Sequence, residues 1–382
     1  MITRIINGTA LLPDGTENRA DIGIGDGVIT RVGATGGGGT AIDARELLVL
    51  PGIVDVHGDA FERSLMPRPG ITFDHAIALA EADRTMVAHG ITTGYLGLTV
   101  SWEPGLRSLA AGQETVAALA AARPHLAADL RLQIRWETFA LHAVDVVVSW
   151  LDDIASPVVA FNDHTTKTLE NRTDPVKLQK WADRSGLTAV AYQALVEQVA
   201  AGRGDVPAAI ARVAGEARRR GIVILSHDDE TREQRAFYRG LGATVCEFPL
   251  TMEAIEDARS HGEPTVLGAP NILRGGSHTG ALTAADMVAA GLCSTLASDY
   301  YYPAQIAAAF KIVRMQGSTL GAVWPLVSTN GARAMGLADR GEIAPGQRAD
   351  LIVVDPRGPR PAVVATFVAG RLVHLARDLV AP

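Results

Sequence analysis

One short motif with potential metal ligands, His57-Gly58-Asp59, directly follows the apolar run LLVLPGIVDV. Imidazole nitrogen and carboxylate oxygen together are suitable ligands for zinc, manganese or iron. A bound ion of this kind lowers the pKa of water towards about 7 and so supplies hydroxide at neutral pH. A single His-x-Asp pair often arises by chance, so it predicts metal chemistry only if other ligands join it.

Five further potential ligands or proton acceptors stand where other apolar runs end: Glu137, His164, His227, Glu247 and Asp299. Each has an ordinary structural explanation when taken alone. An acid after a strand is commonly a helix N-cap, and a single histidine is commonly structural. Their coincidence at the ends of separate runs favours one shared site.

The runs that must position these residues alternate with helical stretches. The runs are LLVLPGIVDVHGD, GITTGYLGLTV, LRLQIRWETF, SPVVAFNDH, GIVILSHDD, ATVCEFP, PTVLGAP and LCSTLASDY. Several are continuously apolar, which is typical of parallel strands buried on both faces. Helical periodicity is clearest over 75–90, 207–221 and 284–291, and the last two stretches end in glycine, the usual helix-stop residue.

Eight strand–helix units predict an α/β fold of the (β/α)8 TIM-like barrel type. In such a barrel the catalytic groups gather at the carboxyl ends of the strands. A doubly wound open sheet is the alternative, but no GxGxxG motif follows the first strand to support a dinucleotide-binding version of it.

The two ends of the chain have a different pattern. Residues 1–50 and 341–382 contain short strand-like runs separated by Gly and Asp turns. Because chain termini often lie close together, we expect them to pair into one small β-sandwich, with residues 51–340 forming the barrel.

Composition narrows the class of protein. Hydrophobic residues make up 47% and charged residues 20%, which is typical of a globular chain, and the net charge of −7 disfavours nucleic acid as a partner. Only two cysteines occur, so the disulfide-rich secreted class is excluded. Without a signal pattern or a long apolar run, we expect a cytoplasmic protein with no membrane partner. Apolar helical faces favour a homo-oligomer.

Several segments resemble the amidohydrolase superfamily, namely LPGIVDVHGD, ASDY and GEIAPGQRADLIVVD. Others are similar to the branch with diphosphatases of phosphonate breakdown: HGDAFERSLMPRPGI, NDHT, SHDDET, EFPLT, LGAPNILRGGSHTG and ASDYYYPA. The resemblance spans nearly the whole chain. It implies a barrel flanked by a split β-sandwich and one or two divalent metal ions, zinc first, with manganese or iron as alternatives.

The resemblance also assigns roles to the strand-end residues. His57 and Asp59 match the metal pair of the first strand. Asp299 matches the last-strand aspartate, which binds metal and handles the proton of the attacking water. Glu137 matches a carboxylate that replaces a carbamylated lysine as the bridging ligand in some members.

His164 and His227 match the two histidines of a second metal ion, with one departure from the family pattern. In this sequence they fall on the fourth and fifth strands, whereas the family places them on the fifth and sixth. The sixth strand then offers only Glu247, so the resemblance leaves open whether Glu247 replaces a histidine and how many ions are bound.

A triphosphate substrate requires cations near the metal site, and five residues are candidates: Arg63, Arg68, Lys167, Arg274 and His278. Arginine forks match phosphate oxygens, and the Gly-rich loop that contains His278 can form an anion nest. Alternatively, Arg63 and Arg68 brace a loop against nearby acids. The segment GYLGLTVSWEPGLRS differs from what the branch implies, which leaves room for a distinct substrate.

The resemblance therefore favours hydrolysis of α-D-ribose 1-methylphosphonate 5-triphosphate to the 5-phosphate and pyrophosphate. The first alternative keeps the metal site but cleaves a C–N bond of an amide, cyclic amide or amidine. The second alternative, a non-catalytic relative that binds a ligand or serves in an assembly, predicts that metal ligands are missing.

Overall fold

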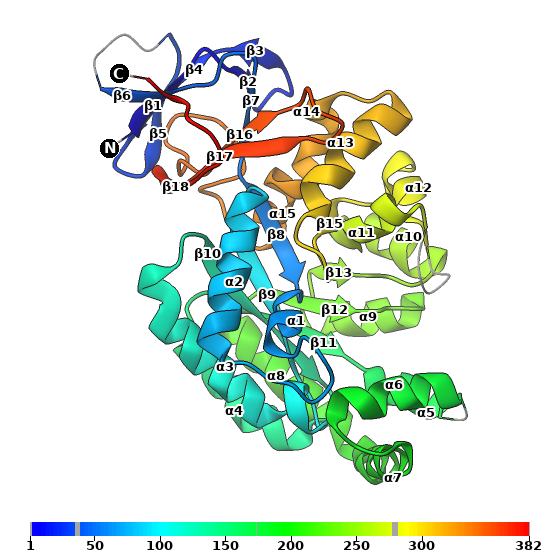
Figure 1. Ribbon diagram of the computed structural model, residues 1–382. Coiled ribbons are helices and arrows are strands. Elements are labelled where there is room, and N and C mark those ends of the chain that lie inside the picture. Colours follow the sequence, from blue (N-terminus) through cyan, green and yellow to red (C-terminus); the bar gives the residue numbers. More distant parts are fainter. Residues whose placement is uncertain (1, 35–38, 173, 277–281, 382) are drawn as a thin grey trace.

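The computed structural model describes residues 2–34, 39–172, 174–276 and 282–381, and its centre is a parallel eight-stranded barrel (Figure 1). Neighbouring strands pair in chain order, and each predicted run contains one of them, so the predicted barrel is confirmed. The strands are β8 Ile53–Gly58, β9 Ile91–Val100, β10 Asp129–Glu137, β11 Val158–Asn162, β12 Ile224–His227, β13 Val245–Glu247, β14 Thr265–Gly268 and β15 Thr295–Ala297. Every residue of β8 and β9 is buried, as continuous apolar runs predict.

Helices surround this barrel and fill the connections between its strands. They include α2 His75–Ala88, α3 Leu109–Ala122, α4 Val144–Asp153, α8 Val206–Arg219, α9 Arg232–Gly240, α10 Met252–Ser260, α12 Ala284–Ala289 and α13 Ala304–Gln316. The three predicted helices correspond to α2, α8 and α12. Gly221 and Gly291, just beyond the last two, adopt φ angles of 66° and 70°, which glycine tolerates without a Cβ clash.

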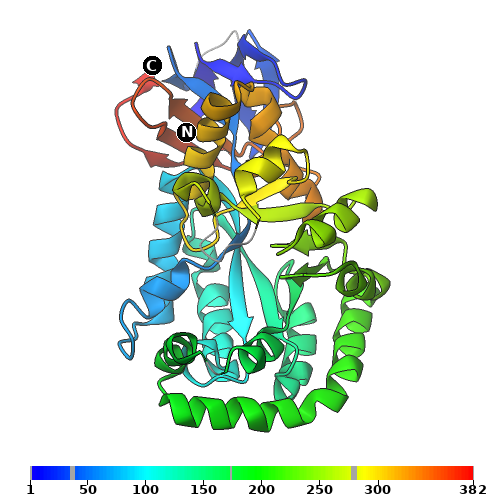
Figure 2. The same cartoon turned by 90° about the vertical axis from the view of Figure 1, so that its right-hand side faces the viewer.

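Further helices belong to the connections after β8, β11, β14 and β15. They are α1 Phe61–Leu65, α5 His164–Glu170, α6 Pro175–Ser185, α7 Ala189–Ala200 and α11 Ala269–Arg274, with α14 Leu320–Val323 and α15 Thr329–Ala334 nearer the carboxyl end. Figure 2 shows α5 to α7 on the side of the barrel away from the terminal strands. Among the described residues, none of the helices has the length and apolar character needed to span a bilayer.

The two ends of the chain pair in two further sheets, as predicted. One sheet has the order β19-β6-β1-β4-β5 and the other β18-β17-β16-β7-β2-β3. Their strands are β1 Ile2–Ile6, β2 Thr9–Leu11, β3 Glu17–Arg19, β4 Asp21–Gly25, β5 Val28–Gly33, β6 Thr40–Asp43, β7 Leu48–Pro51, β16 Leu351–Asp355, β17 Ala362–Val368, β18 Arg371–Leu375 and β19 Val380–Ala381. Side chains from both sheets, including Ile22, Ile42 and Phe367, share one buried core. The exact division into 1–50 plus 341–382 and 51–340 stays a prediction.

The barrel closes where the end of β8 meets the end of β15. Gly58 and Asp299 form a parallel bridge there. The backbone N–H of Asp299 donates to the carbonyl of His57, and the N–H of Asp59 donates to the carbonyl of Asp299, each at 2.9 Å. This seam therefore brings together two predicted ligand segments from opposite ends of the sequence.

The buried carboxylate of Asp55 fastens the same seam. Its oxygens accept from the backbone N–H of Ser298 at 2.9 Å and from the Ser298 hydroxyl at 2.6 Å. Burial raises the pKa of Asp55, and the bonds from Ser298 counteract this. Replacing Asp55 would leave buried donors without an acceptor, which costs more than the loss of the bonds alone.

We predict that Asp55→Ala lowers the free energy of unfolding by about 3 kcal/mol, because two buried donors of Ser298 lose their acceptor. Ser298→Ala removes one hydroxyl and should cost about 1 kcal/mol. Urea unfolding followed by circular dichroism measures both, with the exposed Glu17→Ala as a control. Equal stability of Asp55→Ala and the control would contradict the role of the seam.

Candidate metal centre

Three non-glycine residues at the carboxyl ends of barrel strands have left-handed backbone conformations. The φ angles are 62° for Asp228, 52° for Phe248 and 55° for Asp299. Such a conformation costs of order 1–3 kcal/mol per residue and persists only where the surroundings enforce it. Here each N–H bonds to the neighbouring strand, to the carbonyls of Glu247, Val266 and His57, respectively. The same rim that carries the predicted ligands is thus held in a strained shape.

The first potential ligand group consists of His57, Asp59 and Asp299, whose donor atoms lie within 4.8 Å of one another. His57 is buried, and its Nδ1 lies 3.0 Å from Oε1 of Glu247. The direction is wrong for a hydrogen bond, so within the described part of the chain this nitrogen has no hydrogen-bond partner. A buried imidazole and two carboxylates with donor atoms this close together are a ligand set that fits a divalent cation.

The two carboxylates of this group have opposite pKa shifts. Burial and the neighbouring Asp59 raise the pKa of Asp299 to about 6. Burial also acts to raise the pKa of Asp59, but the positive charges around it, with Arg135 first, together outweigh burial and the pKa falls below its ordinary value. Asp59 is therefore an ionised ligand, whereas Asp299 can exchange a proton near neutral pH.

Glu247 links His57 to His227 within the barrel. It is fully buried, its Oε2 lies 2.7 Å from Nδ1 of His227, and its Oε1 accepts from the amide of Gln133 at 2.6 Å. Burial alone would raise the pKa of Glu247, but the two histidines hold it far below its ordinary value. An ionised Glu247 fixes the proton of His227 on Nδ1, which leaves Nε2 as the free lone pair.

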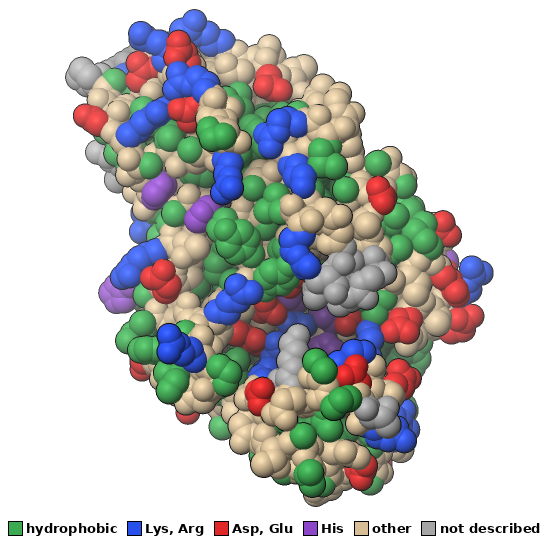
Figure 3. All heavy atoms as spheres, turned by 45° about the vertical axis from the view of Figure 1, so that its right-hand side comes forward, with side chains coloured by type: hydrophobic (Ala, Val, Ile, Leu, Met, Phe, Trp, Pro, Cys, Tyr) green, Lys and Arg blue, Asp and Glu red, His purple; other side chains and the backbone are tan. Residues whose placement is uncertain are grey.

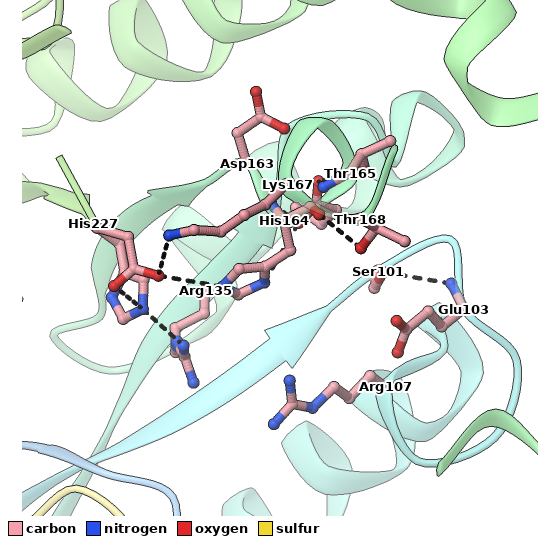
Figure 4. A network of polar contacts seen from close by, with 12 residues as sticks. Ser101, Glu103, Arg107, Arg135, Asp163, His164, Thr165, Lys167, Thr168 and His227 are labelled. Carbon is pink, nitrogen blue, oxygen red and sulfur yellow. Dashed lines mark hydrogen bonds and ion pairs between the residues drawn. The ribbon is translucent and has the colours of Figure 1, made fainter. Parts of the chain in front are cut away.

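The second potential ligand group consists of His164, His227 and Asp228. Oδ2 of Asp228 lies 3.9 Å from Nε2 of His164, and Oδ1 lies 3.7 Å from Nε2 of His227. The ammonium of Lys167 lies 3.8 Å from the same carboxylate (Figure 4). The two predicted histidines are therefore neighbours, and Asp228, which the sequence analysis did not select as a ligand, joins them.

Glu137 has a different environment from the one that the family role implies. Its oxygens accept from the backbone N–H groups of His164 and Thr165 and, at 2.7 Å, from the Thr165 hydroxyl, so it caps the first turn of α5. Burial raises its pKa to about 8. Among the described residues, neither of these two groups contains Glu137, nor does a third one made of His57, His227 and Glu247. Its role as a bridging ligand stays a prediction.

Arg135 is a central residue that sequence reasoning missed. It lies on β10 and is 5% exposed, with Nη1 at 3.3 Å from Oδ2 of Asp59 and Nη2 at 3.0 Å from Nε2 of His227. Figure 4 shows its guanidinium next to His227. The signal was present in the alternation of Gln133, Arg135 and Glu137, because alternate residues of a strand share one face.

The predicted phosphate-binding arginines lie at the rim, where the surface is hollowed and contains histidine, acidic and basic side chains (Figure 3). The guanidinium of Arg63 lies 5.4 Å from the ring centre of Tyr300. Arg274 donates to the Tyr300 hydroxyl at 3.4 Å.

Arg63 and Arg68 also line a cavity of about 840 Å³ with apolar walls from the loop after α1 and from α6. Lys167 lies beside Asp228 of the second ligand group, and His278 lies outside the described residues.

The loop after β9 anchors the walls of this cavity. Arg107 forms two hydrogen bonds with Glu62 of α1, at 3.1 and 2.8 Å. Glu103 pairs with Arg184 of α6 and accepts from the hydroxyl of Tyr192 of α7 at 2.7 Å. The segment that differs from the expected family branch therefore determines how α1 and α6 are placed.

Comparison with known proteins places these features in context. Residues 48–375 match the profile of the Amidohydrolase family. The α-D-ribose 1-methylphosphonate 5-triphosphate diphosphatase of Escherichia coli strain K12 is 31% identical over 320 residues, which cover 82% of this chain and 84% of that protein. The structure of 5-methylcytosine deaminase from Klebsiella pneumoniae superposes with a TM-score of 0.63 at 16% identity, covering 98% of each chain. Molinate hydrolase gives 0.64 at 14% identity, covering 97% of this chain and 94% of that one. The two structures show a shared fold.

We predict that the chelator-treated protein binds a divalent ion and that Zn²⁺ at about 100 times its Kd stabilises the fold by about 2.7 kcal/mol. His57→Ala should weaken Zn²⁺ binding by at least about 100-fold, more than the loss of an outer partner typically does. Isothermal titration calorimetry measures both. The control is Asp163→Asn, which alters a carboxylate of the same rim and retains the helix cap. Equal affinities of the two variants would remove His57 from the site.

Proposed function

Because the chain belongs to the amidohydrolase family, as its motifs predicted, we propose that it is a metal-dependent hydrolase that releases pyrophosphate from α-D-ribose 1-methylphosphonate 5-triphosphate. The observation that carries the proposal is the meeting of Arg63 and Arg274 at Tyr300, the residue that follows Asp299. Cleavage of a polyphosphate ester requires positive charge next to its phosphates. Two arginines beside a carboxylate–histidine group meet this requirement. The similarity to the E. coli diphosphatase over most of both chains supports the same substrate class.

His57, Asp59 and Asp299 are the residues that would hold the ion. A divalent ion, with zinc first and manganese or iron as alternatives, supplies a Lewis acid that activates water and neutralises charge on phosphoryl oxygens. The buried setting of His57 and the ionised state of Asp59 favour binding of such a cation. Arg135 holds Asp59 in place through one of its two carboxylate oxygens.

Asp299 acts as the proton acceptor in the proposed reaction. It receives a proton from water as the water oxygen bonds to the α-phosphorus. The bond from that phosphorus to the bridging oxygen then breaks, which releases pyrophosphate and leaves a ribose 5-phosphate. A pKa raised to about 6 suits this exchange, because a base works best when its pKa is near the working pH. Gly268 faces the carboxylate, and a Cβ at that position would lie 3.3 Å from its Oδ2.

Arg63, Arg68 and Arg274 bind the leaving pyrophosphate. All three side chains lie at the rim and are exposed, so they can rotate to meet phosphate oxygens. Charge-assisted bonds from guanidinium groups stabilise the negative charge that builds up on the leaving group. The apolar part of the cavity then accommodates the organic part of the substrate.

The alternative function is hydrolysis of a C–N bond in an amide, cyclic amide or amidine. It uses the same His57, Asp59 and Asp299 group, with Asp299 passing its proton to the leaving nitrogen. The C–N alternative does not explain why two arginines meet at Tyr300. We therefore favour cleavage of a phosphoanhydride bond. A purely binding relative is disfavoured further, because the strand-end ligands are present.

We predict that the metal-replete protein releases pyrophosphate from α-D-ribose 1-methylphosphonate 5-triphosphate. Asp299→Asn should lower kcat by about 10²–10⁴-fold, the usual contribution of a general base. A coupled pyrophosphate assay measures this, and thermal unfolding of the variant checks its fold. Turnover of cyclic amides without any pyrophosphate release would replace the proposal with the C–N alternative.

We predict that Arg63→Met and Arg274→Met each raise KM for the triphosphate by about 10-fold or more, because a hydrogen bond to a charged group contributes about 1.5–3 kcal/mol. The steady-state KM from the same assay measures the effect. Arg212→Met is the matched control, since that arginine pairs with Asp145 on the outer helices. A KM equal to that of the control would assign the two arginines to loop bracing.

A further inference from the structure

We propose that Arg135 takes the place of a second metal ion, so that the chain binds one divalent ion, at His57, Asp59 and Asp299. The inference rests on the metal site of the proposed function and is independent of its substrate. Two groups of potential ligands lie side by side. In this inference the ion occupies the first group, and the guanidinium of Arg135 contacts His227 of the second.

The side chain of Arg135 fills a defined space in the centre of the barrel. Arg135 lies on β10 and is buried, and its side chain passes over Gly97 of the neighbouring strand β9. A Cβ on Gly97 would lie 3.1 Å from Cδ of Arg135 and 3.4 Å from Nε2 of His57. The missing side chain at Gly97 therefore leaves the room in which the arginine and the histidine lie next to each other.

The guanidinium uses the lone pair that a second ion would need. Glu247 lies 2.7 Å from Nδ1 of His227 and sets the proton there, so Nε2 is the nitrogen available to a ligand. Nη2 of Arg135 lies 3.0 Å from that Nε2. An ion bound by His227 would have to displace Arg135 from a buried position.

The carboxylate of Asp59 connects the first group to the guanidinium. Its Oδ2 faces Nη1 of Arg135 at 3.3 Å, which leaves Oδ1 for an ion held with His57 and Asp299. Asp59 thus bridges an ion and an arginine, in the way that a carboxylate bridges two ions in a dinuclear centre. One ion and one guanidinium satisfy the acids of the first group.

The second group has a further cation beside it. Lys167 lies 3.8 Å from Asp228 and 3.2 Å from Glu230. With Arg135 on the side of His227 and Lys167 on the side of Asp228, a dication at this group would face two positive charges at close range. Water screens the charge of the partly exposed Lys167, whereas the charge of the buried Arg135 is only weakly screened.

The experiment measures metal stoichiometry, which separates this inference from activity. Chelator-treated protein is titrated with Mn²⁺ by isothermal titration calorimetry and by electron paramagnetic resonance. We expect one ion per chain and the six-line spectrum of an isolated Mn²⁺. Arg135→Met, which removes the charge and keeps the bulk, should bind two ions and give the spectrum of a coupled pair.

Three variants identify the cause. Arg135→Met combined with His227→Ala should return to one ion, because the second ion needs Nε2 of His227. Arg135→Lys keeps a positive charge and should bind one ion. Lys167→Met should also bind one, because Arg135 still occupies the lone pair of His227.

Several outcomes would overturn the inference. Two coupled ions in the unaltered protein would refute it and leave the proposed hydrolase function standing. One ion in a folded Arg135→Met, verified by circular dichroism, would likewise refute it. Failure of the unaltered protein to bind Mn²⁺ or Zn²⁺ would refute both the inference and the metal-dependent function.

Discussion

The arrangement of the whole site depends on closure of the barrel between β8 and β15. Asp55 and Ser298, 243 positions apart in the chain, bond to each other inside this seam. The backbone of His57 and Asp299 is joined directly beside them. Since parallel strands all end at the same rim, closing the barrel is enough to bring a first-strand and a last-strand ligand into one group. The meeting of the proposed ligands His57, Asp59 and Asp299 is therefore a consequence of topology.

A second constraint is the balance of buried charge at the mouth of the barrel. Glu247, His57, Asp59, His227 and Arg135 form one connected set of two acids and three basic side chains. Charges taken out of water are tolerated only when they are paired and hydrogen-bonded, and removing one partner leaves the others uncompensated. This explains why Gln133, a neutral amide, completes the bonds of Glu247. A metal cation bound to His57 would therefore join charged groups that are already paired with one another.

The sequence predicted the fold well because its signals were local. Apolar runs that end in His57, His227 or Asp299 mark both a buried strand and its rim. Arg135 was missed because it lies inside such a run and not at its polar end. The capping of α5 by Glu137 depends on where the helix begins relative to β10, which no local pattern encodes. The pairing of Asp228 with His164 similarly depends on the bend that a φ of 62° introduces after β12.

The proposed metal ligands and the walls of the cavity belong to different parts of the fold, which bears on substrate specificity. The ligands stand on strand ends that the closed barrel fixes, whereas the cavity walls depend on the loop after β9. Arg107 and Glu103 of that loop bond to α1 and α6, on opposite sides of the cavity. Both ion pairs are largely shielded from water, so they fix the walls more firmly than exposed pairs could. A change in this loop alters the shape of the cavity and leaves His57, Asp59 and Asp299 in place. The departure of this segment from the family branch therefore affects the walls of the cavity and not the strand ends that carry the proposed ligands.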